Sequence, residues 1–241
     1  MPALKRIGTA IERTGFQPLI ALFCLSSALV FAHLVEEVAE GGTAASDRAI
    51  LLAFRTAKDP SIPIGPPWLL QSAIDISALG GFTVIWFLTI AASGFLILAR
   101  RWRALFILLA AIGGASLLNT ALKLSFHRER PEITAHLAQS WSASFPSGHA
   151  MISAAAYMTI AAILAQTQTS KAVRIYLVSL AVLVTMLIGL SRIYLGVHWP
   201  SDVAAGWSAG AAWALCFWII TRKAAPETKD AEAALQKDAG G

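Results

Sequence analysis

The stretch LIGLSRIYLGVHWPSDVAAGW places charged and titratable side chains inside an otherwise apolar sequence. Its middle contains Arg192, His198 and Asp202, and charged groups beside a hydrocarbon layer are costly and usually functional. His198 and Asp202 are four residues apart, so a helix that begins near Pro200 would bring the carboxylate beside the imidazole ring. A carboxylate bonded to one ring nitrogen fixes the tautomer and leaves the other nitrogen free to attack an electrophile or to bind a metal ion. The stretch therefore predicts either a nucleophilic histidine or part of a metal site.

A second polar stretch, FPSGHA, combines helix-start residues with a histidine. Ser147 followed by the small residue Gly148 is typical of a helix N-terminus, and a helix start alone explains the pattern without any ligand. A helix N-terminus also presents unpaired N–H groups and the positive end of the helix dipole, which together form a site for an anion. His149 is then either an ordinary interfacial imidazole or a side chain that acts on the bound anion.

The third polar stretch, KLSFHRERP, is rich in cations. Lys123 and Arg130, taken singly, are typical of side chains that extend from the end of a span to the lipid headgroups. Taken with Arg192, they form a set of positive charges that would repel a divalent cation and attract an anion such as phosphate. We therefore expect an anion site without a metal ion.

The three stretches together match a known pattern. KLSFHRERP follows K-x-x-x-x-x-x-R-P, PSGH is intact, and SRIYLGVHWPSD follows S-R-x-x-x-x-x-H-x-x-x-D. In order and spacing they resemble the tripartite signature of the type-2 phosphatidic acid phosphatase superfamily. That superfamily includes bacterial phosphatidylglycerophosphate and undecaprenyl-diphosphate phosphatases and the soluble vanadium haloperoxidases. Each motif alone is weak, whereas all three in order are specific, and no signature position between residues 123 and 202 departs from the pattern.

The resemblance implies a role for each matching residue. It implies a catalytic set in which His198 is the nucleophile, Asp202 orients it, and His149 protonates the leaving lipid oxygen. The residues implied to hold the phosphate are Lys123, Arg130, Arg192, Ser147 and the backbone N–H of Gly148. Ser191 belongs to the motif as well, without a defined role. Phosphoryl transfer depends above all on positioning and charge stabilisation, which three cations and a helix N-terminus supply without Mg²⁺ or another cofactor.

The composition of the whole chain indicates the solvent in which these motifs lie. Of the 241 residues, 56% are hydrophobic and 14% are charged, and the mean hydropathy is +0.64. A soluble domain carries about 25% charged residues, so the composition indicates a membrane protein. The net charge of +5 does not indicate nucleic-acid binding, because the cations stand in short groups between apolar runs. Cys24 and Cys216 lie within apolar runs without CxxC spacing, which favours buried thiols over a disulfide or a metal site.

Six apolar runs are long enough to form helices that cross a bilayer, each of which requires about 20 mostly apolar residues. They are 17–38, 76–99, 102–122, 148–165, 173–190 and 201–221. The first run is longer than the core of a signal peptide and lacks a clear cleavage site, so we expect it to be retained. We predict an all-α membrane protein whose domain, residues 1–221, contains six transmembrane helices. A polar cytoplasmic tail, either disordered or a frayed helix, is predicted at 222–241.

The distribution of Lys and Arg predicts the orientation of these spans. With the N-terminus inside, the inner segments hold 12 of the 19 cations and the outer segments hold 7. Cytoplasmic loops carry the excess of Lys and Arg, so both termini are predicted to be cytoplasmic. The three motifs then lie on the outer face, and size and resemblance favour the inner membrane of a bacterium. The outer segment 39–67 is either a short interfacial helix with Ser46 as its N-cap or a simple surface connector.

These observations predict an integral-membrane lipid phosphatase that works through a phosphohistidine intermediate, with an active site facing the periplasm or the exterior. The expected partners are a phosphorylated lipid and the surrounding membrane lipids. Undecaprenyl diphosphate, phosphatidic acid and phosphatidylglycerophosphate all present a phosphate on an apolar anchor, and the residues do not choose among them. Two alternatives stay open: a lipid phosphotransferase whose acceptor is not water, and a lipid-binding or transport protein without catalysis. The intact His149, His198 and Asp202 argue against the second alternative.

Overall fold

The computed structural model of the protein describes residues 17–132 and 143–223. The helices are α2 (Gln17–Glu40), α3 (Ala44–Ala53), α4 (Pro67–Ala78), α5 (Phe82–Leu98), α6 (Trp102–Ser125), α7 (Gly148–Gln166), α8 (Lys171–Tyr194) and α9 (Pro200–Lys223). The predicted all-α fold is confirmed for this part of the chain, where the sole strand-like pairing is an isolated bridge between Arg55 and Pro63.

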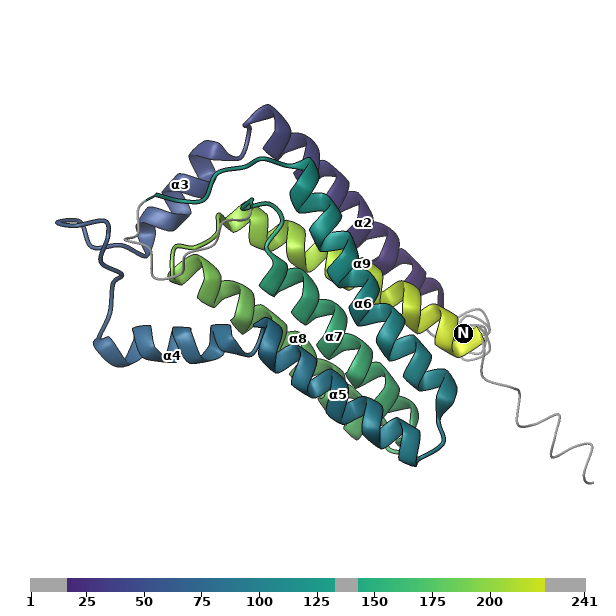
Figure 1. Ribbon diagram of the computed structural model, residues 1–241. Helices are drawn as coiled ribbons and strands as arrows, with labels where there is room; N and C mark the ends of the chain where they lie inside the picture. Colours follow the sequence, from purple (N-terminus) through teal and green to yellow (C-terminus); the bar gives the residue numbers. More distant parts are fainter. Residues whose placement is uncertain (1–16, 133–142, 224–241) are drawn as a thin grey trace, which may run out of the picture.

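The helices form a bundle in which α7 packs against α6, α8 and α9, and α9 also packs against α2 (Figure 1). Glycines allow α7 and α9 to approach closely. A Cβ at Gly206 would lie 2.7 Å from the carbonyl oxygen of Ser147, and a Cβ at Gly210 would lie 2.4 Å from that of Met151. Small residues four positions apart are typical of closely packed transmembrane helices. The second and third turns of α9 therefore pack directly against the first turn of α7.

Four of the described helices are long and apolar enough to cross a membrane: α2, α6, α7 and α8. Large apolar side chains such as Phe23, Leu29 and Leu117 are exposed along them, as expected of surfaces in contact with lipid. The pair formed by α4 and α5 is a fifth candidate span, bent by 46°. The helix α9 matches the predicted run 201–221 in position but is not among these candidates, so the count of six spans stays a prediction.

The predicted span at 76–99 differs from the structure, because the helix is broken between α4 and α5 at residues 79–81. A Cβ at Gly80 would lie 2.5 Å from Cγ2 of Ile188 on α8 and 3.3 Å from the carbonyl oxygen of His149 on α7. The break lets the chain pass close to both helices, and α4 then packs against α8. This packing brings Ser77, near the end of α4, to the site described below.

The outer segment 39–67 contains the helix α3, which was one of its two expected structures. The predicted N-cap is wrong: α3 begins at Ala44, and the residue before it is Thr43. Ser46 lies inside the first turn and donates a hydrogen bond to the carbonyl oxygen of Thr43 (2.9 Å). Asp47 and Leu51 are both buried, so α3 is packed onto the bundle rather than lying free at its surface.

The two ends of the bundle carry different segments (Figure 1). The start of α2, the end of α9 and the α5–α6 and α7–α8 connections lie at one end, whereas α3 and the three motifs lie at the other. The helix α9 extends to Lys223, so the first two residues of the predicted tail, Arg222 and Lys223, are helical. The rest of that tail, 224–241, lies outside the described residues.

Candidate active site

The three motifs meet between the end of α6, the first turn of α7 and the loop that joins α8 to α9. His149 lies within electrostatic range of Lys123, Arg130, Arg192 and His198. Segments that are far apart in the chain therefore place their cations and both motif histidines around one point.

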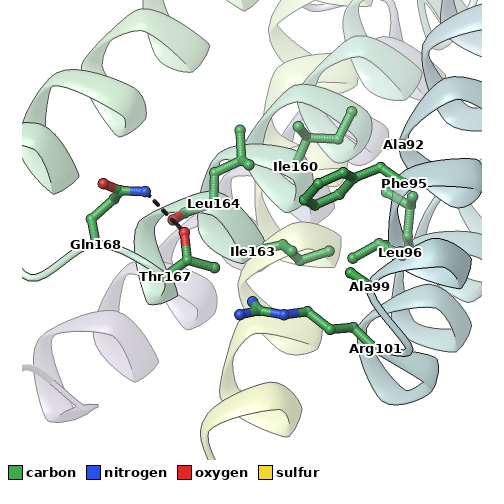
Figure 2. A pocket seen from close by; sticks show the side chains of 11 residues that line it. Ala92, Phe95, Leu96, Ala99, Arg101, Ile160, Ile163, Leu164, Thr167 and Gln168 are labelled. Carbon is green, nitrogen blue, oxygen red and sulfur yellow. Dashed lines mark hydrogen bonds between the residues drawn. The ribbon is translucent and has the colours of Figure 1, made fainter.

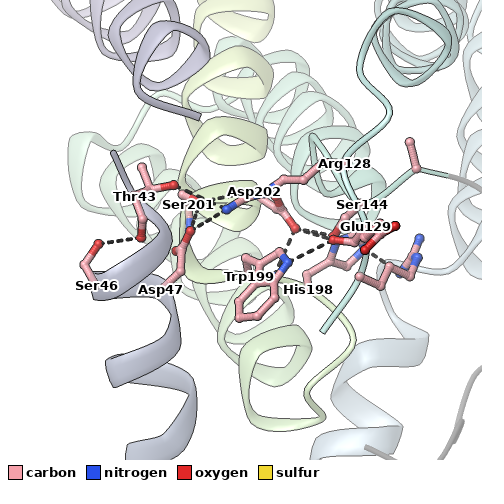
Figure 3. A network of polar contacts seen from close by, with 12 residues as sticks. Thr43, Ser46, Asp47, Arg128, Glu129, Ser144, His198, Trp199, Ser201 and Asp202 are labelled. Carbon is pink, nitrogen blue, oxygen red and sulfur yellow. Dashed lines mark hydrogen bonds and ion pairs between the residues drawn. The ribbon is translucent and has the colours of Figure 1, made fainter. Parts of the chain in front are cut away.

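His198 is held on one side by Asp202. Nδ1 of the ring lies 3.4 Å from Asp202 Oδ2, and because α9 begins at Pro200, the four-residue spacing sets the carboxylate beside the ring as the sequence predicts. The same oxygen accepts hydrogen bonds from the backbone N–H of Trp199 (3.0 Å) and from Ser144 Oγ. Figure 3 shows these contacts converging on Asp202. The hydrogen bonds fix the carboxylate, and the carboxylate in turn fixes the ring.

The other ring nitrogen of His198 faces a cation. Arg130 Nη1 lies 3.3 Å from His198 Nε2 and also donates to the carbonyl oxygen of Val197 (2.8 Å). A guanidinium only donates hydrogen bonds, so Nε2 is the acceptor in this contact. The proton of the neutral ring then lies on Nδ1, facing Asp202. This is the tautomer in which the lone pair of Nε2 is available for attack.

Burial keeps His198 neutral. The side chain is 2% exposed, and the pKa of the ring is lowered from 6.5 to about 4, with desolvation by burial as the largest cause. Asp202 acts in the opposite direction and raises this pKa, whereas Arg130 and Arg192 contribute to its lowering. Burial and the two cations outweigh the carboxylate, so the ring is unprotonated at neutral pH.

The first turn of α7 offers hydrogen-bond donors to an anion. Ser147 precedes the helix, and its buried Oγ has no hydrogen-bond partner within the described part of the chain. Gly148 begins the helix, whose first N–H groups lack partners inside it. A Cβ at Gly148 would lie 3.1 Å from Nδ2 of Asn119, so a glycine here lets a polar side chain of α6 approach this turn. An orphaned hydroxyl beside the N–H groups of a helix start matches a site for phosphate oxygens.

Two further cations reach the site from α6 and α8. Lys123, in the last turn of α6, donates to the carbonyl oxygen of Ala143 (2.7 Å). Arg192, in the last turn of α8, donates from Nη1 to Ser77 Oγ on α4 (2.7 Å). The side chain of Arg192 is buried, and its Nε has no hydrogen-bond partner among the residues that the structure describes. Both positive charges are thus held in place.

Sequence reasoning missed four residues that support this site. Ser144 and Arg128 lie in or beside the motifs, at positions that the signature leaves open, and each donates to Asp202. Asp47 on α3 and Ser77 on α4 come from parts of the chain without any motif. Proximity to a motif was a signal for the first two. Nothing in the sequence distinguishes the other two from surface residues.

A cavity of about 370 Å³ lies near the opposite end of α7 (Figure 2). Its lining is mainly apolar, as with Phe95, Leu96 and Ile163, and Arg101 is its charged residue. Ile163 follows His149 by 14 residues on the same helix, which corresponds to a separation of roughly 20 Å along its axis. This cavity is therefore separate from the cluster of cations and histidines.

The chain belongs to the PAP2 superfamily, whose family model matches residues 104–226 and so includes all three motifs. The resemblance expected from those motifs is confirmed. The protein is a PAP2 lipid phosphatase, a hydrolase that acts on phosphate esters, and it is held in a membrane by its apolar helices.

Individual relatives share this class. Phosphatidylglycerophosphatase B of Bacillus subtilis is 33% identical over 178 residues, which are 71% of this chain and 83% of the relative. A decaprenylphosphoryl-5-phosphoribose phosphatase of Mycobacterium tuberculosis is 31% identical over 166 residues, 68% of this chain and 84% of the relative. The crystal structure of a transmembrane PAP2-type phosphatidylglycerolphosphate phosphatase from Bacillus subtilis superposes with a TM-score of 0.76 at 28% identity. That match covers 85% of this chain and 98% of the crystallised one.

Proposed function

We propose that the protein removes phosphate from a membrane lipid through a covalent phosphohistidine on His198. The observation that carries this proposal is the pair of contacts made by the imidazole ring, whose Nδ1 faces Asp202 and whose Nε2 accepts from Arg130. The ring is thus oriented, and its available lone pair lies next to a cation that would bind phosphate oxygens. A histidine that only bound a lipid headgroup would instead present a donor to the anion.

The reaction would proceed by two displacements. In the first, the lone pair of His198 Nε2 attacks phosphorus, and the ester P–O bond breaks as the N–P bond forms. His149 gives its proton to the departing oxygen, so a monoester lipid leaves as an alcohol. In the second, His149 takes a proton from water, whose oxygen displaces Nε2 from phosphorus and releases inorganic phosphate. Asp202 supports both steps because its negative charge stabilises the positively charged phosphohistidine ring.

The cations of the site would carry the charge of the transferring group. Lys123, Arg130 and Arg192 would hold phosphate oxygens, and the remaining donors would be the Ser147 hydroxyl and the Gly148 N–H. Arg130 must exchange partners, since a phosphate oxygen replaces Nε2 as its acceptor and frees the lone pair for attack. Fixed cations supply the charge that a divalent metal supplies elsewhere, so we propose turnover without one. Within the described residues, no group of three or more His, Cys, Asp or Glu side chains could hold a metal ion.

Phosphatidylglycerophosphate is the substrate that we propose first. Phosphatidylglycerophosphatase B and the crystallised phosphatidylglycerolphosphate phosphatase are both named for it, and this chain covers most of the length of each. A polyprenyl-linked phosphate is the second candidate, supported by the mycobacterial relative. Both molecules carry a phosphate on a long apolar anchor, which fits a cluster of cations at the ends of lipid-facing helices.

The test is phosphate release by the purified protein in detergent, across a panel of phosphatidylglycerophosphate, phosphatidic acid, undecaprenyl diphosphate and a polyprenylphosphoryl sugar that carries a terminal phosphate. The expected result is the highest kcat/KM on phosphatidylglycerophosphate. A higher kcat/KM on a polyprenyl compound would change the proposed substrate but not the proposed reaction. Transfer of labelled phosphate to added alcohols, in preference to water, would identify a phosphotransferase. Binding of these lipids without any release of phosphate would identify a non-catalytic protein.

We propose six spans with both termini in the cytoplasm and the active site on the outer face. Of the seven cations predicted outside, five make buried or partly buried contacts that explain their presence there: Arg55, Lys123, Arg128, Arg130 and Arg192. Discounting them leaves two outer cations against twelve inner ones, so the excess on the inner side becomes larger.

Cysteine labelling tests this orientation. In a Cys24→Ala/Cys216→Ala background, Ser61→Cys should react with a membrane-impermeant maleimide in intact cells. Thr169→Cys, also at an exposed position, should react only after permeabilisation. The reverse pattern would place the site in the cytoplasm.

A further inference from the structure

Arg128 joins two buried carboxylates that belong to different helices. Its Nη1 donates to Asp202 Oδ1 (2.6 Å), and its Nη2 donates to Asp47 Oδ2 (2.7 Å). Asp202 is 0% exposed and Asp47 is 2% exposed. Figure 3 shows the line of contacts that runs from α3 through Arg128 to the start of α9. Arg128 lies at a position that the signature leaves open, Asp47 lies outside the signature, and the two displacements described above give neither residue a role.

Asp202 requires a counter-ion of its own. The ring of His198 is neutral in the resting site, so it does not compensate the charge of a fully buried carboxylate. Burying an unpaired charge is costly, and such a group usually becomes neutral unless another charge pairs with it. A neutral Asp202 would no longer stabilise a positive ring. Arg128 on Oδ1 keeps the carboxylate ionised while Oδ2 stays directed at His198.

Asp47 holds Arg128 in place. Its Oδ1 accepts from the backbone N–H of Ser201 (2.8 Å), and its Oδ2 accepts from the hydroxyl of the same residue (2.5 Å). Asp47 thus satisfies an N–H group in the first turn of α9, although it comes 154 residues earlier in the chain. Arg128 donates to the same hydroxyl (2.7 Å), and its guanidinium lies 5.8 Å from the centre of the Trp199 ring. The guanidinium is therefore fixed from several sides.

We propose that Arg128 and Asp47 are positioning residues of the phosphatase: Arg128 sets the charge and direction of Asp202, and Asp47 on α3 holds Arg128 against α9. The inference rests on the function proposed above, because a carboxylate that supports a phosphohistidine is what the two residues position. The helix α3, which carries none of the motifs, then takes part in catalysis as well as in packing.

The two residues should act on the His198–Asp202 pair with opposite sign. Removing the positive charge of Arg128 leaves Asp202 less compensated, so the pair takes up its proton at a higher pH. Removing the negative charge of Asp47 leaves the full charge of Arg128 on Asp202, so the pair takes up its proton at a lower pH. The other charged or titratable groups that face the pair are the same in both variants: Lys123, Arg130, His149 and Arg192.

The experiment is an NMR titration of the full-length protein in detergent with ¹³C-labelled histidine. The signal of His198 is identified by its loss from the spectrum of His198→Gln. Arg128→Gln should raise the midpoint by roughly one pH unit, and Asp47→Asn should lower it. Arg48→Gln and Glu40→Gln remove exposed charges on and beside α3, and as matched controls they should leave the midpoint unchanged.

Arg128→Lys separates charge from geometry. It keeps the positive charge, so the midpoint should stay near that of the wild type. The kcat for lipid-phosphate hydrolysis should nevertheless fall roughly 10²-fold, because an ammonium group cannot bridge both carboxylates as the planar fork does. In the double variant Asp47→Asn/Arg128→Gln the two charge changes offset each other, so the midpoint should return towards the wild-type value while kcat stays low.

Two outcomes would overturn the inference. One is a midpoint that moves in the same direction in Arg128→Gln and Asp47→Asn. The other is a midpoint that moves in neither variant while kcat falls, which would show that the residues serve only the fold. Thermal unfolding identifies any variant that does not fold. If Arg128→Gln does not fold, the midpoint of Asp47→Asn and the midpoint and kcat of Arg128→Lys decide the question. If the variants show these titration shifts but the wild-type protein hydrolyses no lipid phosphate, the proposed function is overturned and the charge coupling stands.

Discussion

The two walls of the site are built differently. The wall formed by the α8–α9 loop and the first turn of α9 is complete without a ligand, because His198 is contacted at both ring nitrogens and both oxygens of Asp202 accept hydrogen bonds. The wall formed by the first turn of α7 still has hydrogen-bonding capacity that no protein group uses in the described part of the chain. The hydroxyl of Ser147 is buried without a partner in the described part of the chain, and His149 is only partly buried.

This difference shows which tasks each wall can perform. In the proposed reaction the nucleophile has to be aimed and kept neutral in advance, and the α9 wall provides both for His198. A group that passes protons between the leaving oxygen and water has to remain accessible to both, and the partly open His149 meets that condition. In the proposed reaction, the α7 wall becomes complete when a phosphate supplies acceptors for its donors.

The largest expected effect comes from removing the nucleophile of the complete wall. His198→Gln should lower kcat by a factor on the order of 10⁴ or more, while lipid binding persists through the three cations. His127→Gln, which changes an exposed histidine in the first motif, should leave kcat nearly unchanged. Rapid quenching with labelled lipid phosphate should trap acid-labile, base-stable label on the wild type and none on His198→Gln. Label that persists there but vanishes in His149→Gln would mean that the two histidines have exchanged roles.

Loosening the same wall should have the next largest effect. Asp202→Asn keeps the shape of the side chain but removes its charge and permits the wrong ring tautomer, so kcat should fall by roughly 10³-fold or more. The KM for the lipid should change much less, because Asp202 does not contact the phosphate. Steady-state kinetics on the preferred lipid measures both constants. A loss of less than about tenfold in kcat would show that the ring is oriented without the carboxylate.

A change on the open wall should depend on the leaving group. His149→Gln should lower kcat/KM by about 10²- to 10⁴-fold on a lipid phosphate, whose alkoxide needs a proton as it leaves. The loss should be far smaller on nitrophenyl phosphate, whose leaving group departs without one. Comparing the two substrates on wild type and variant measures the difference. Equal losses on both would contradict the general-acid role and leave His149 as a binding residue.

A titration of His198 tests the difference between the two walls without a measurement of turnover. The pKa of this ring is lowered to about 4, mainly by burial, so the nucleophile is free above that pH and is lost as the pH falls through it. The NMR signal of His198 should therefore titrate well below the ordinary histidine value of 6.5. Asp202→Asn removes the group that raises this pKa, so the midpoint should move to a still lower pH. A wild-type midpoint near 6.5 would mean that the α9 wall is open to water.

The smallest expected effect is that of removing divalent metal. Both walls supply their charge from protein groups, so EDTA should leave kcat and KM unchanged on the preferred lipid. A Mg²⁺-dependent phosphatase in the same buffer is the control and should lose its activity. A loss that Mg²⁺ restores would assign part of the charge stabilisation to a metal ion.

The sequence by itself determined the local pairings and the apolar elements of this protein. The contact between His198 and Asp202 needed only a helix that begins at Pro200 and a spacing of four residues. Five of the six apolar runs predicted helices at nearly the observed positions, since a bilayer-crossing helix has a required length and composition, whereas the run 76–99 is broken at 79–81. The three motifs also predicted that their cations and histidines lie near one another, because the order and spacing of the motifs are specific.

Only the tertiary structure decided how distant segments complete the site. The tautomer of His198 depends on Arg130, which lies 68 residues away, and the counter-ion of Asp202 depends on Arg128, which is itself held by Asp47 81 residues earlier. The break at Gly80 likewise depends on close contacts with Ile188 and His149, which lie on other helices. A helical period fixes contacts three or four residues apart. Contacts over longer distances depend on which apolar faces are buried together, and no local spacing encodes that choice.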